Sequence, residues 1–221
     1  MLFEKLEKDI EERQNVLFEI ERVLFTSRYS LSTKHFEIFT VQSVTMIYSI
    51  WEGFIQNAFN NFIDYINEMH IDRKDIKDEL FMCEIEKNFK QFNELPKRQN
   101  RKLAFYKDLD VFFQNPKLTL SKGMYTENNV SFEVLNNIMK SFCLETFDEH
   151  WKNYSYPNTS LKNSLTSFIR YRNGVSHGGD ISSEEKVTQQ VYEKYKNLVL
   201  DLMYEIIIRM DDGIKSECYI K

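Results

Sequence analysis

The spacing of apolar side chains between residues 34 and 68 constrains the fold more than any other feature of the chain. This segment contains no proline, and its apolar residues recur at helical spacing: Phe36, Phe39, Val44, Ile47, Trp51, Phe54, Ala58, Phe62 and Ile66. Because residues three and four apart lie on one face of an α-helix, the spacing predicts one long amphipathic helix. Such a helix needs other elements to cover its apolar face.

Further helices are predicted by the same spacing over residues 2–25, 70–95, 131–144, 160–178 and 182–211. Ser160 is a suitable N-cap for the fourth of these segments, and Gly178 with Gly179 supplies its stop. Ser182 and Glu185 form a capping box at the start of the last helix. Gly213 is expected to end that helix.

The composition agrees with a helical protein. Only six glycines and three prolines occur in 221 residues, which disfavours a β-rich or disordered chain. Residues 103–113 are too few for periodicity to distinguish helix from strand, and residues 114–130 resemble a loop or a small β-hairpin. We therefore predict an all-α antiparallel helical bundle that forms one domain over residues 1–221. Residues 70–130 would be an insertion-rich middle segment.

Charge and cysteine content exclude several classes of protein. The formal net charge of −5 argues against a protein that is coated in nucleic acid by bulk electrostatics, although it leaves room for a local basic cleft. The three cysteines, Cys83, Cys143 and Cys218, form neither a disulfide framework nor a zinc-binding spacing. The charged N-terminus predicts no signal peptide, and no apolar run is long enough to span a membrane. We expect a cytoplasmic protein.

The end of the 160–178 helix concentrates residues with acid–base and phosphate chemistry. Arg172, Asn173 and His177 lie within six consecutive residues. A histidine can transfer a proton near neutral pH, whereas an arginine stays charged and matches phosphate oxygens. Together they suit cleavage of a phosphodiester, for which no metal and no cofactor is needed. The alternative is a helix C-terminus whose cations complement the helix dipole.

Helical geometry relates these side chains to one another. Asn173 and His177 are four residues apart and share a face with Arg170, whereas Arg172 lies about 140° around the axis from His177. Gly174 is unusual inside a helix, where it costs about 0.5–1 kcal/mol relative to alanine. It predicts a strained or closely approached backbone at this point.

Glu52 is a second candidate site residue. It follows Thr45 and Ser49 in a narrow polar line beside the apolar face of the 34–68 helix, so its carboxylate is expected to have a partner. One interpretation is an ordinary ion pair with an arginine or lysine. The other is that Glu52 orients His177 or Arg172 across the bundle.

Two further clusters permit either a functional or a structural interpretation. Residues 97–102, with the sequence KRQNRK, are the densest basic cluster and would either contact phosphates or form an exposed connector turn. An aromatic group before the 160–178 helix would either stack on unpaired bases or cover the end of the bundle; it comprises His150, Trp151, Tyr154 and Tyr156.

Three segments resemble one family. Arg172, four intervening residues and His177 resemble the Arg-x4–6-His motif of the HEPN superfamily. Residues 47–54, with the sequence IYSIWEGF, and residues 126–144 resemble corresponding segments of its prokaryotic MAE-type subfamily. The resemblance spans most of the chain. It implies an all-helical homodimer with a composite active site at the two Arg-His motifs, and metal-independent endoribonuclease activity in a toxin–antitoxin or anti-phage system.

The resemblance also gives the site residues their expected roles. His177 would be the general acid or base, Arg172 would stabilise the phosphate, and Asn173 would position His177 or the substrate, with Glu52 as the fourth catalytic candidate. Arg170, Tyr171 and Ser176 would contact the substrate, which we expect to be single-stranded RNA. An antitoxin protein is a possible partner. The alternative is an inactive HEPN-type module that binds RNA or protein.

Overall fold

The computed structural model describes residues 2–89, 91, 95–117, 119–123, 129–153, 160–176 and 187–221. These residues form seven α-helices and one 3-10 turn: α1 (Leu2–Phe25), α2 (Thr33–Glu68), η1 (Arg73–Asp75), α3 (Asp78–Asn88), α4 (Gln99–Gln114), α5 (Phe132–Ser141), α6 (Leu161–Ser176) and α7 (Gln189–Lys215). Within the described ranges the only β-type pairings are two isolated bridges. The predicted all-α fold is confirmed.

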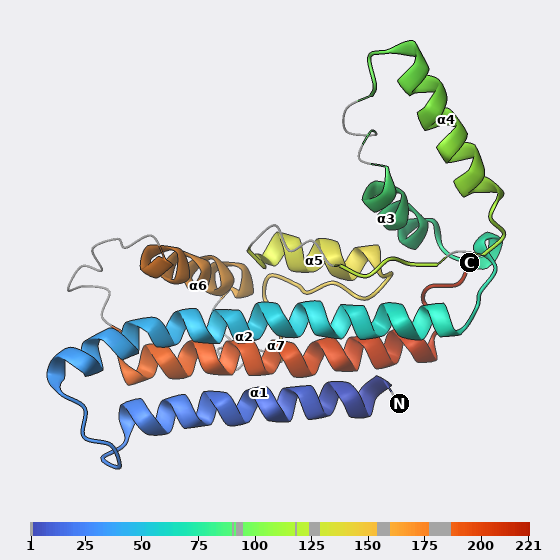
Figure 1. The fold of residues 1–221 in the computed structure, drawn as a ribbon. Coiled ribbons are helices and arrows are strands. Elements are labelled where there is room, and N and C mark those ends of the chain that lie inside the picture. The colour runs from blue at the N-terminus through green and yellow to red at the C-terminus, as the bar shows by residue number, and fades with distance from the viewer. Residues whose placement is uncertain are drawn as a thin grey trace.

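Three long helices form the body of the bundle. α1 runs antiparallel to both α2 and α7, which lie side by side and run in the same direction (Figure 1). Their apolar faces enclose a core in which Ile47, Trp51, Leu198 and Leu202 are fully buried. α5 and α6 pack on the other side of the α2–α7 layer (Figure 1). The α2–α6 contact positions the residues considered below.

Several predicted helix boundaries are confirmed by the caps that form there. α1 occupies the predicted residues 2–25. Ser32 Oγ accepts a hydrogen bond from the backbone N–H of His35 at 3.3 Å and begins α2. Ser160 Oγ accepts one from the N–H of Asn163 at 3.2 Å and begins α6. Each serine satisfies one of the N–H groups that a helix start leaves without an intrahelical partner.

The predicted boundaries of the last helix need correction. α7 begins at Gln189, where Thr188 Oγ1 accepts a hydrogen bond from Val191 N–H at 3.3 Å; the Ser182–Glu185 capping box lies outside the described residues. α7 also continues through Gly213 to Lys215. A Cβ atom at Gly213 would lie 2.5 Å from Leu144 Cδ2. Gly213 is therefore a packing position inside α7 rather than a stop.

The middle of the chain forms a projecting arm, by which we mean α3 and α4. The arm rises beside the C-terminal end of α2, at the opposite end from α6 (Figure 1). The undecided segment 103–113 is helical, and the described part of the helix predicted over 70–95 forms the turn η1 at 73–75 and α3 at 78–88. Phenylalanine pairs join the two helices, with ring centroids 5.5 Å apart for Phe81–Phe112 and 6.1 Å for Phe89–Phe105. α4 nevertheless contains no buried residue.

None of the helices in the described part of the chain is long and apolar enough to cross a membrane.

Candidate functional site

Arg172 lies on α6 in a defined position against α2. Its guanidinium carbon is 4.5 Å from the centroid of the Tyr48 ring, which is a cation–π contact. Its Nη1 donates to Asn173 Oδ1 at 2.8 Å and, at 3.4 Å, to Asn129 Oδ1. A planar guanidinium that is stacked on one side and hydrogen-bonded at its edge has little rotational freedom. The half-buried Arg172 is thus oriented before any ligand binds.

Tyr48 is the platform for Arg172 and is itself fixed. The side chain is 1% exposed, and its hydroxyl accepts a hydrogen bond from the Val130 N–H at 2.7 Å. Its ring meets the Phe168 ring edge-on, with centroids 5.5 Å apart. Burial raises the pKa of Tyr48 above 10.0; the nearby Glu52 carboxylate adds to this rise, whereas Arg172 opposes it. Tyr48 is therefore a neutral, rigid platform at physiological pH.

Aromatic stacking holds the inner face of α6 against α7. The Phe168 ring stacks on Tyr195 with centroids 4.8 Å apart, and Tyr171 meets the same Tyr195 ring at 5.7 Å. Phe168 is fully buried, whereas Tyr171 is half-buried. The structure therefore gives Tyr171, a predicted substrate contact, a packing role that fixes the rotation of α6 about its axis.

Glu52 lies one helical turn after Tyr48 on α2, on the same side as Arg172. The side chain is half-buried, and both Glu52 and Arg172 act electrostatically on the Tyr48 hydroxyl. Both charged residues therefore lie near the same tyrosine hydroxyl. Whether Glu52 acts on Arg172 or on His177 stays a prediction.

The exposed face of α6 is open rather than crowded. Gly174 lies inside α6 without a positive φ angle, and no other residue comes within 4 Å of the position a Cβ would take. The predicted strain or close approach at Gly174 is therefore wrong within the described chain. Arg170 is also exposed on α6. Within the described part of the chain, Gly174 therefore leaves a strip of α6 beside Arg172 uncovered.

Some predicted site residues cannot be placed. His177 lies outside the described residues, as do Gly178 and Gly179, and the side chain of Ser176 does as well. The predicted shared face of Asn173 and His177 therefore stays a prediction. What the structure adds is a partner for Asn173, whose side-chain oxygen holds Arg172.

The remaining predicted clusters lie away from Arg172. Trp151 is only 8% exposed and packs edge-on against Phe147, so it covers the bundle, as the structural interpretation predicted. Tyr154 and Tyr156 lie outside the described residues. The basic residues 97–102 form the turn before α4 and its first turn, at the outer end of the arm (Figure 1). In the described residues, no three His, Cys, Asp or Glu side chains are grouped as metal ligands would be.

Within the WEG sequence of residues 51–53, the glycine has a packing role. Arg13 of α1 donates from Nη1 to the carbonyl oxygen of Ile50 at 2.9 Å and from Nε to Asp9 at 2.9 Å. A Cβ at Gly53 would lie 3.1 Å from Arg13 Nη1. Gly53 therefore lets the guanidinium of Arg13 reach the α2 backbone, while Trp51 is fully buried in the core.

Sequence reasoning did not identify Tyr48 and Asn129 as site residues. Both lie inside segments that were noted for other reasons, Tyr48 in residues 47–54 and Asn129 in residues 126–144. Neither residue type signals a site by itself, because a tyrosine in an apolar run is usually core and an asparagine before a helix is usually a turn. Their role follows only from the contacts with Arg172.

Comparison with known proteins identifies the family of this chain. The chain matches the family model described as MAE_28990-like HEPN over residues 2–219. No curated protein and no solved structure matches the chain. The matched range includes all three segments that meet around Arg172, together with the arm and the long helices. The chain therefore belongs to the HEPN superfamily and, within it, to the MAE_28990-like HEPN family.

Proposed function

We propose that this protein is a metal-independent endoribonuclease that cleaves single-stranded RNA, with Arg172 and His177 as its central catalytic residues. The observation that carries the proposal is the orientation of Arg172, which is stacked on Tyr48 and hydrogen-bonded to two asparagine side chains. Membership of the HEPN superfamily, whose domains are generally ribonucleases, supports the same reaction class.

The chemistry is an internal transfer at phosphorus. His177 removes the proton from a ribose 2′-hydroxyl, and the 2′-oxygen forms a bond to the adjacent phosphorus. The bond from phosphorus to the 5′-oxygen breaks, and that oxygen takes up a proton as it leaves. The products are a 2′,3′-cyclic phosphate and a free 5′-hydroxyl. Arg172 stabilises the negative charge that develops on the non-bridging oxygens.

The surroundings of Arg172 suit this role. A guanidinium whose plane is set by the Tyr48 ring can present two parallel N–H groups to a phosphate, which a lysine ammonium cannot do. Asn129 and Asn173 hold it with neutral amide oxygens. Preorganised donors avoid reorganisation when charge develops. Asn173 therefore acts through Arg172, and Glu52 acts on the same charged cluster.

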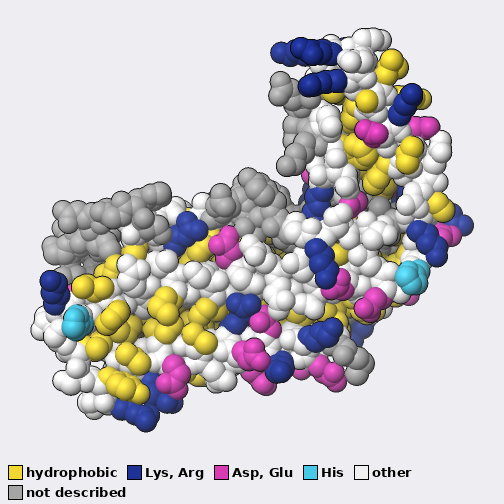
Figure 2. Space-filling model, viewed as in Figure 1, with side chains coloured by type: hydrophobic (Ala, Val, Ile, Leu, Met, Phe, Trp, Pro, Cys, Tyr) yellow, Lys and Arg dark blue, Asp and Glu magenta, His cyan; other side chains and the backbone are white. Residues whose placement is uncertain are grey.

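A homodimer would complete the site. A twofold interface uses the same patch of both subunits, so contact between two α6 helices near Gly174 would bring both Arg172 side chains to one cleft. The groove between α1 and α2 also supports association, because Val16, Phe39 and Met46 expose 47%, 49% and 46% of their surface there. This apolar surface is visible as yellow side chains in Figure 2.

The biological setting that we propose is a toxin or an anti-phage effector in the cytoplasm. An endoribonuclease without sequence-specific contacts would damage the RNA of its own cell, so it needs a trigger or an inhibitor. An antitoxin protein is one such inhibitor.

The rival function is an inactive HEPN module that binds RNA or another protein. The apolar groove between α1 and α2 favours this alternative as much as it favours a dimer. In that case Arg172 would bind phosphate, or would only stabilise the contact between α6 and α2.

A substrate with a single reactive position separates these functions. A 20-nucleotide strand that carries 2′-O-methyl groups at every position except one ribonucleotide is compared with the same strand carrying 2′-deoxyribose at that one position, both in EDTA. The proposal expects cleavage of the RNA with a cyclic-phosphate end and at least about a thousandfold loss with the deoxy strand, because the attacking oxygen is absent. Equal cleavage of the two strands would disprove the mechanism. Tight binding without cleavage, by a folded dimer, would favour the inactive module.

A further inference from the structure

Residues 95–117, which include α4 of the arm, concentrate positive charge in an otherwise acidic protein, whereas α3 carries more acidic than basic side chains. Residues 95–117 contain six lysines and arginines but only two aspartates, whereas the whole chain has a net charge of −5. Figure 2 shows lysine and arginine side chains gathered at the outer end of the arm. Because the rest of the surface is on balance acidic, the outer end of the arm is a local exception that favours an anionic ligand.

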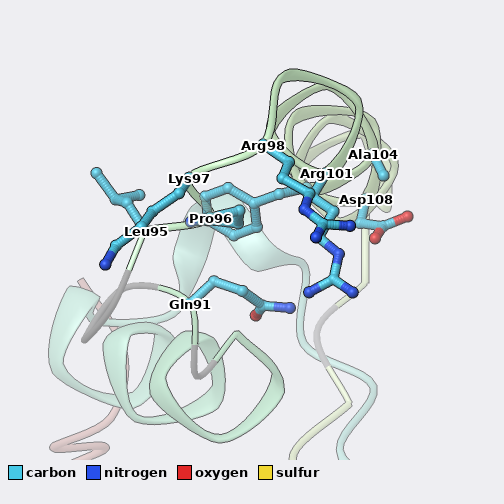
Figure 3. Close-up of a pocket in the computed structure, with 9 residues that line it drawn as sticks. Gln91, Leu95, Pro96, Lys97, Arg98, Arg101, Ala104 and Asp108 are labelled. Atoms are coloured by element: carbon cyan, nitrogen blue, oxygen red, sulfur yellow. The ribbon is translucent and has the colours of Figure 1, made fainter.

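A cavity of about 600 Å³ lies at this end of the arm, and we call it the arm pocket. Among the described residues its charged lining consists of Lys97, Arg98, Arg101 and Asp108, so three cations face one carboxylate there. Figure 3 shows the guanidinium groups of Arg98 and Arg101 on the same side of the cavity, with the Gln91 amide below them. The volume falls within the range of about 300–1,000 Å³ that small-ligand sites occupy.

The cations of the arm pocket are available to a ligand. Lys97, Arg98 and Arg101 are exposed, and none of them forms an ion pair with another residue that the structure describes. Arginine side chains at this spacing can bind one phosphate together or two successive phosphates separately. The pocket therefore has the donors, the net charge and the access that a phosphate ligand needs.

Aromatic surface accompanies these charges, which favours a nucleic acid over a simple anion. The half-buried Phe105 lines the arm pocket. Tyr106 is 68% exposed and lies one helical turn after Lys102, on the adjoining side of α4. Single-strand-binding surfaces combine a cationic groove with aromatic rings on which bases stack. α4 buries none of its residues, so both charged and aromatic groups remain accessible.

We propose that the arm pocket binds backbone phosphates of single-stranded RNA as an accessory site for the strand whose cleavage occurs at Arg172. This inference rests on the proposed function, because it assumes that the strand continues to the site on α6. The arm and α6 rise from the same side of the α2–α7 layer, at opposite ends of α2 (Figure 1). One strand can therefore contact both places without wrapping around the molecule.

The length of α2 sets the minimum length of such a strand. Tyr48 lies under Arg172, and α2 continues from there to Glu68, beside which the arm begins. At 1.5 Å per residue this part of the helix is about 30 Å long. At about 3.4 Å per nucleotide, a fully stacked strand needs about nine nucleotides to reach from Arg172 to the arm. A tetranucleotide is too short to occupy both sites of one subunit even when its backbone is fully extended.

The test measures binding and cleavage separately. The double variant Arg98→Gln/Arg101→Gln is compared with Lys107→Gln/Lys117→Gln, which removes the same charge at positions outside the pocket. Binding is measured with a 20-nucleotide 2′-O-methyl RNA, which cannot be cleaved, between 50 and 200 mM salt. Cleavage is measured with an unmodified 20-mer and with a tetranucleotide. Circular dichroism confirms that the variants remain helical.

We expect the pocket variant to bind the 2′-O-methyl RNA at least about tenfold more weakly. The slope of the logarithm of the binding constant against the logarithm of the salt concentration should become less steep by about 1.4, since each of two lost phosphate contacts on a single strand contributes about 0.7. The pocket variant should also lose kcat/KM on the 20-mer but not on the tetranucleotide. The control variant should change each of these quantities much less.

Several outcomes would overturn the inference. One is an RNA affinity of the pocket variant equal to that of the wild type, and another is an equal loss of RNA affinity in the control variant. A third is a loss of kcat/KM by the pocket variant on the tetranucleotide as large as its loss on the 20-mer. A changed sedimentation coefficient without a change in RNA affinity would make this face a protein contact instead. Arm-dependent binding by a wild type that cleaves no RNA would leave the arm pocket correct as an RNA site and disprove the proposed nuclease function.

Discussion

Replacing Tyr48 tests whether this side chain is the platform that orients Arg172. Tyr48→Phe removes the hydroxyl that accepts the hydrogen bond from the buried Val130 N–H but keeps the ring under the guanidinium. An unsatisfied buried donor costs about 1–3 kcal/mol, and we expect a loss of that size in the free energy of unfolding. Cleavage of RNA should fall only slightly, because Arg172 keeps its stacking partner.

Tyr48→Leu removes both functions of the side chain. In addition to the orphaned N–H, it removes the cation–π contact with Arg172, worth about 0.5–2 kcal/mol, and the edge-on contact with Phe168, worth about 0.5–1.5 kcal/mol. We therefore expect a stability loss of about 2–6 kcal/mol. At temperatures where the variant is still folded, kcat should fall at least about tenfold, because Arg172 no longer has a fixed plane.

Urea unfolding followed by circular dichroism gives the stability, and single-turnover cleavage of a 20-nucleotide RNA gives the rate. Tyr29→Phe is the matched control, since Tyr29 is 45% exposed and its hydroxyl should be dispensable for both quantities. A folded Tyr48→Leu protein with the cleavage rate of the wild type would refute the platform argument. A Tyr48→Phe protein as stable as the wild type would refute the account of the Val130 hydrogen bond.

Three other predictions concern packing and pH. Gly213→Ala should destabilise the protein by about 1–3 kcal/mol in urea unfolding, since its Cβ would lie 2.5 Å from Leu144 Cδ2, and a value near zero would contradict the packing role. Gly174→Ala should stabilise it by about 0.5–1 kcal/mol, because the Cβ enters open space on a helix; a loss of stability would show that the strip is covered. Burial raises the pKa of Tyr48 and Tyr192 above 10.0 and that of Tyr219 to about 12. Because the folded state holds these protons more tightly than the unfolded state, stability should fall as the pH rises from 10 towards 12, less steeply in Tyr219→Phe. A flat profile above pH 10 would contradict this assignment.

Much of the helical architecture followed from local signals. The apolar spacing of residues 34–68 and the serine at 160 predicted α2 and the start of α6, because helix periodicity and N-caps are encoded within a few residues. Gly213 shows where local signals fail. A glycine near a helix end resembles a stop, but here the deciding contact comes from Leu144, which is distant in sequence.

The candidate site was predicted in part for the same physical reason. Arg172 and Asn173 stand out because their side chains have recognisable chemistry at a helix end. Tyr48 and Asn129 do not, since a buried aromatic and a loop amide acquire a role only when the fold places them against a guanidinium. The amphipathic pattern also gave no indication that α4 would bury none of its residues, because burial depends on whether a neighbouring surface is present.

The most direct test of the central claim is cleavage of a mixed-sequence single-stranded RNA in EDTA by wild type, Arg172→Ala and His177→Ala. Arg22→Ala, at an exposed ion pair on α1, serves as the control for loss of an arginine. The account predicts cyclic-phosphate products from the wild type and the control, and a loss of at least about a hundredfold in each of the other two. Equal cleavage by all four proteins would show that the chemistry does not reside at Arg172 and His177.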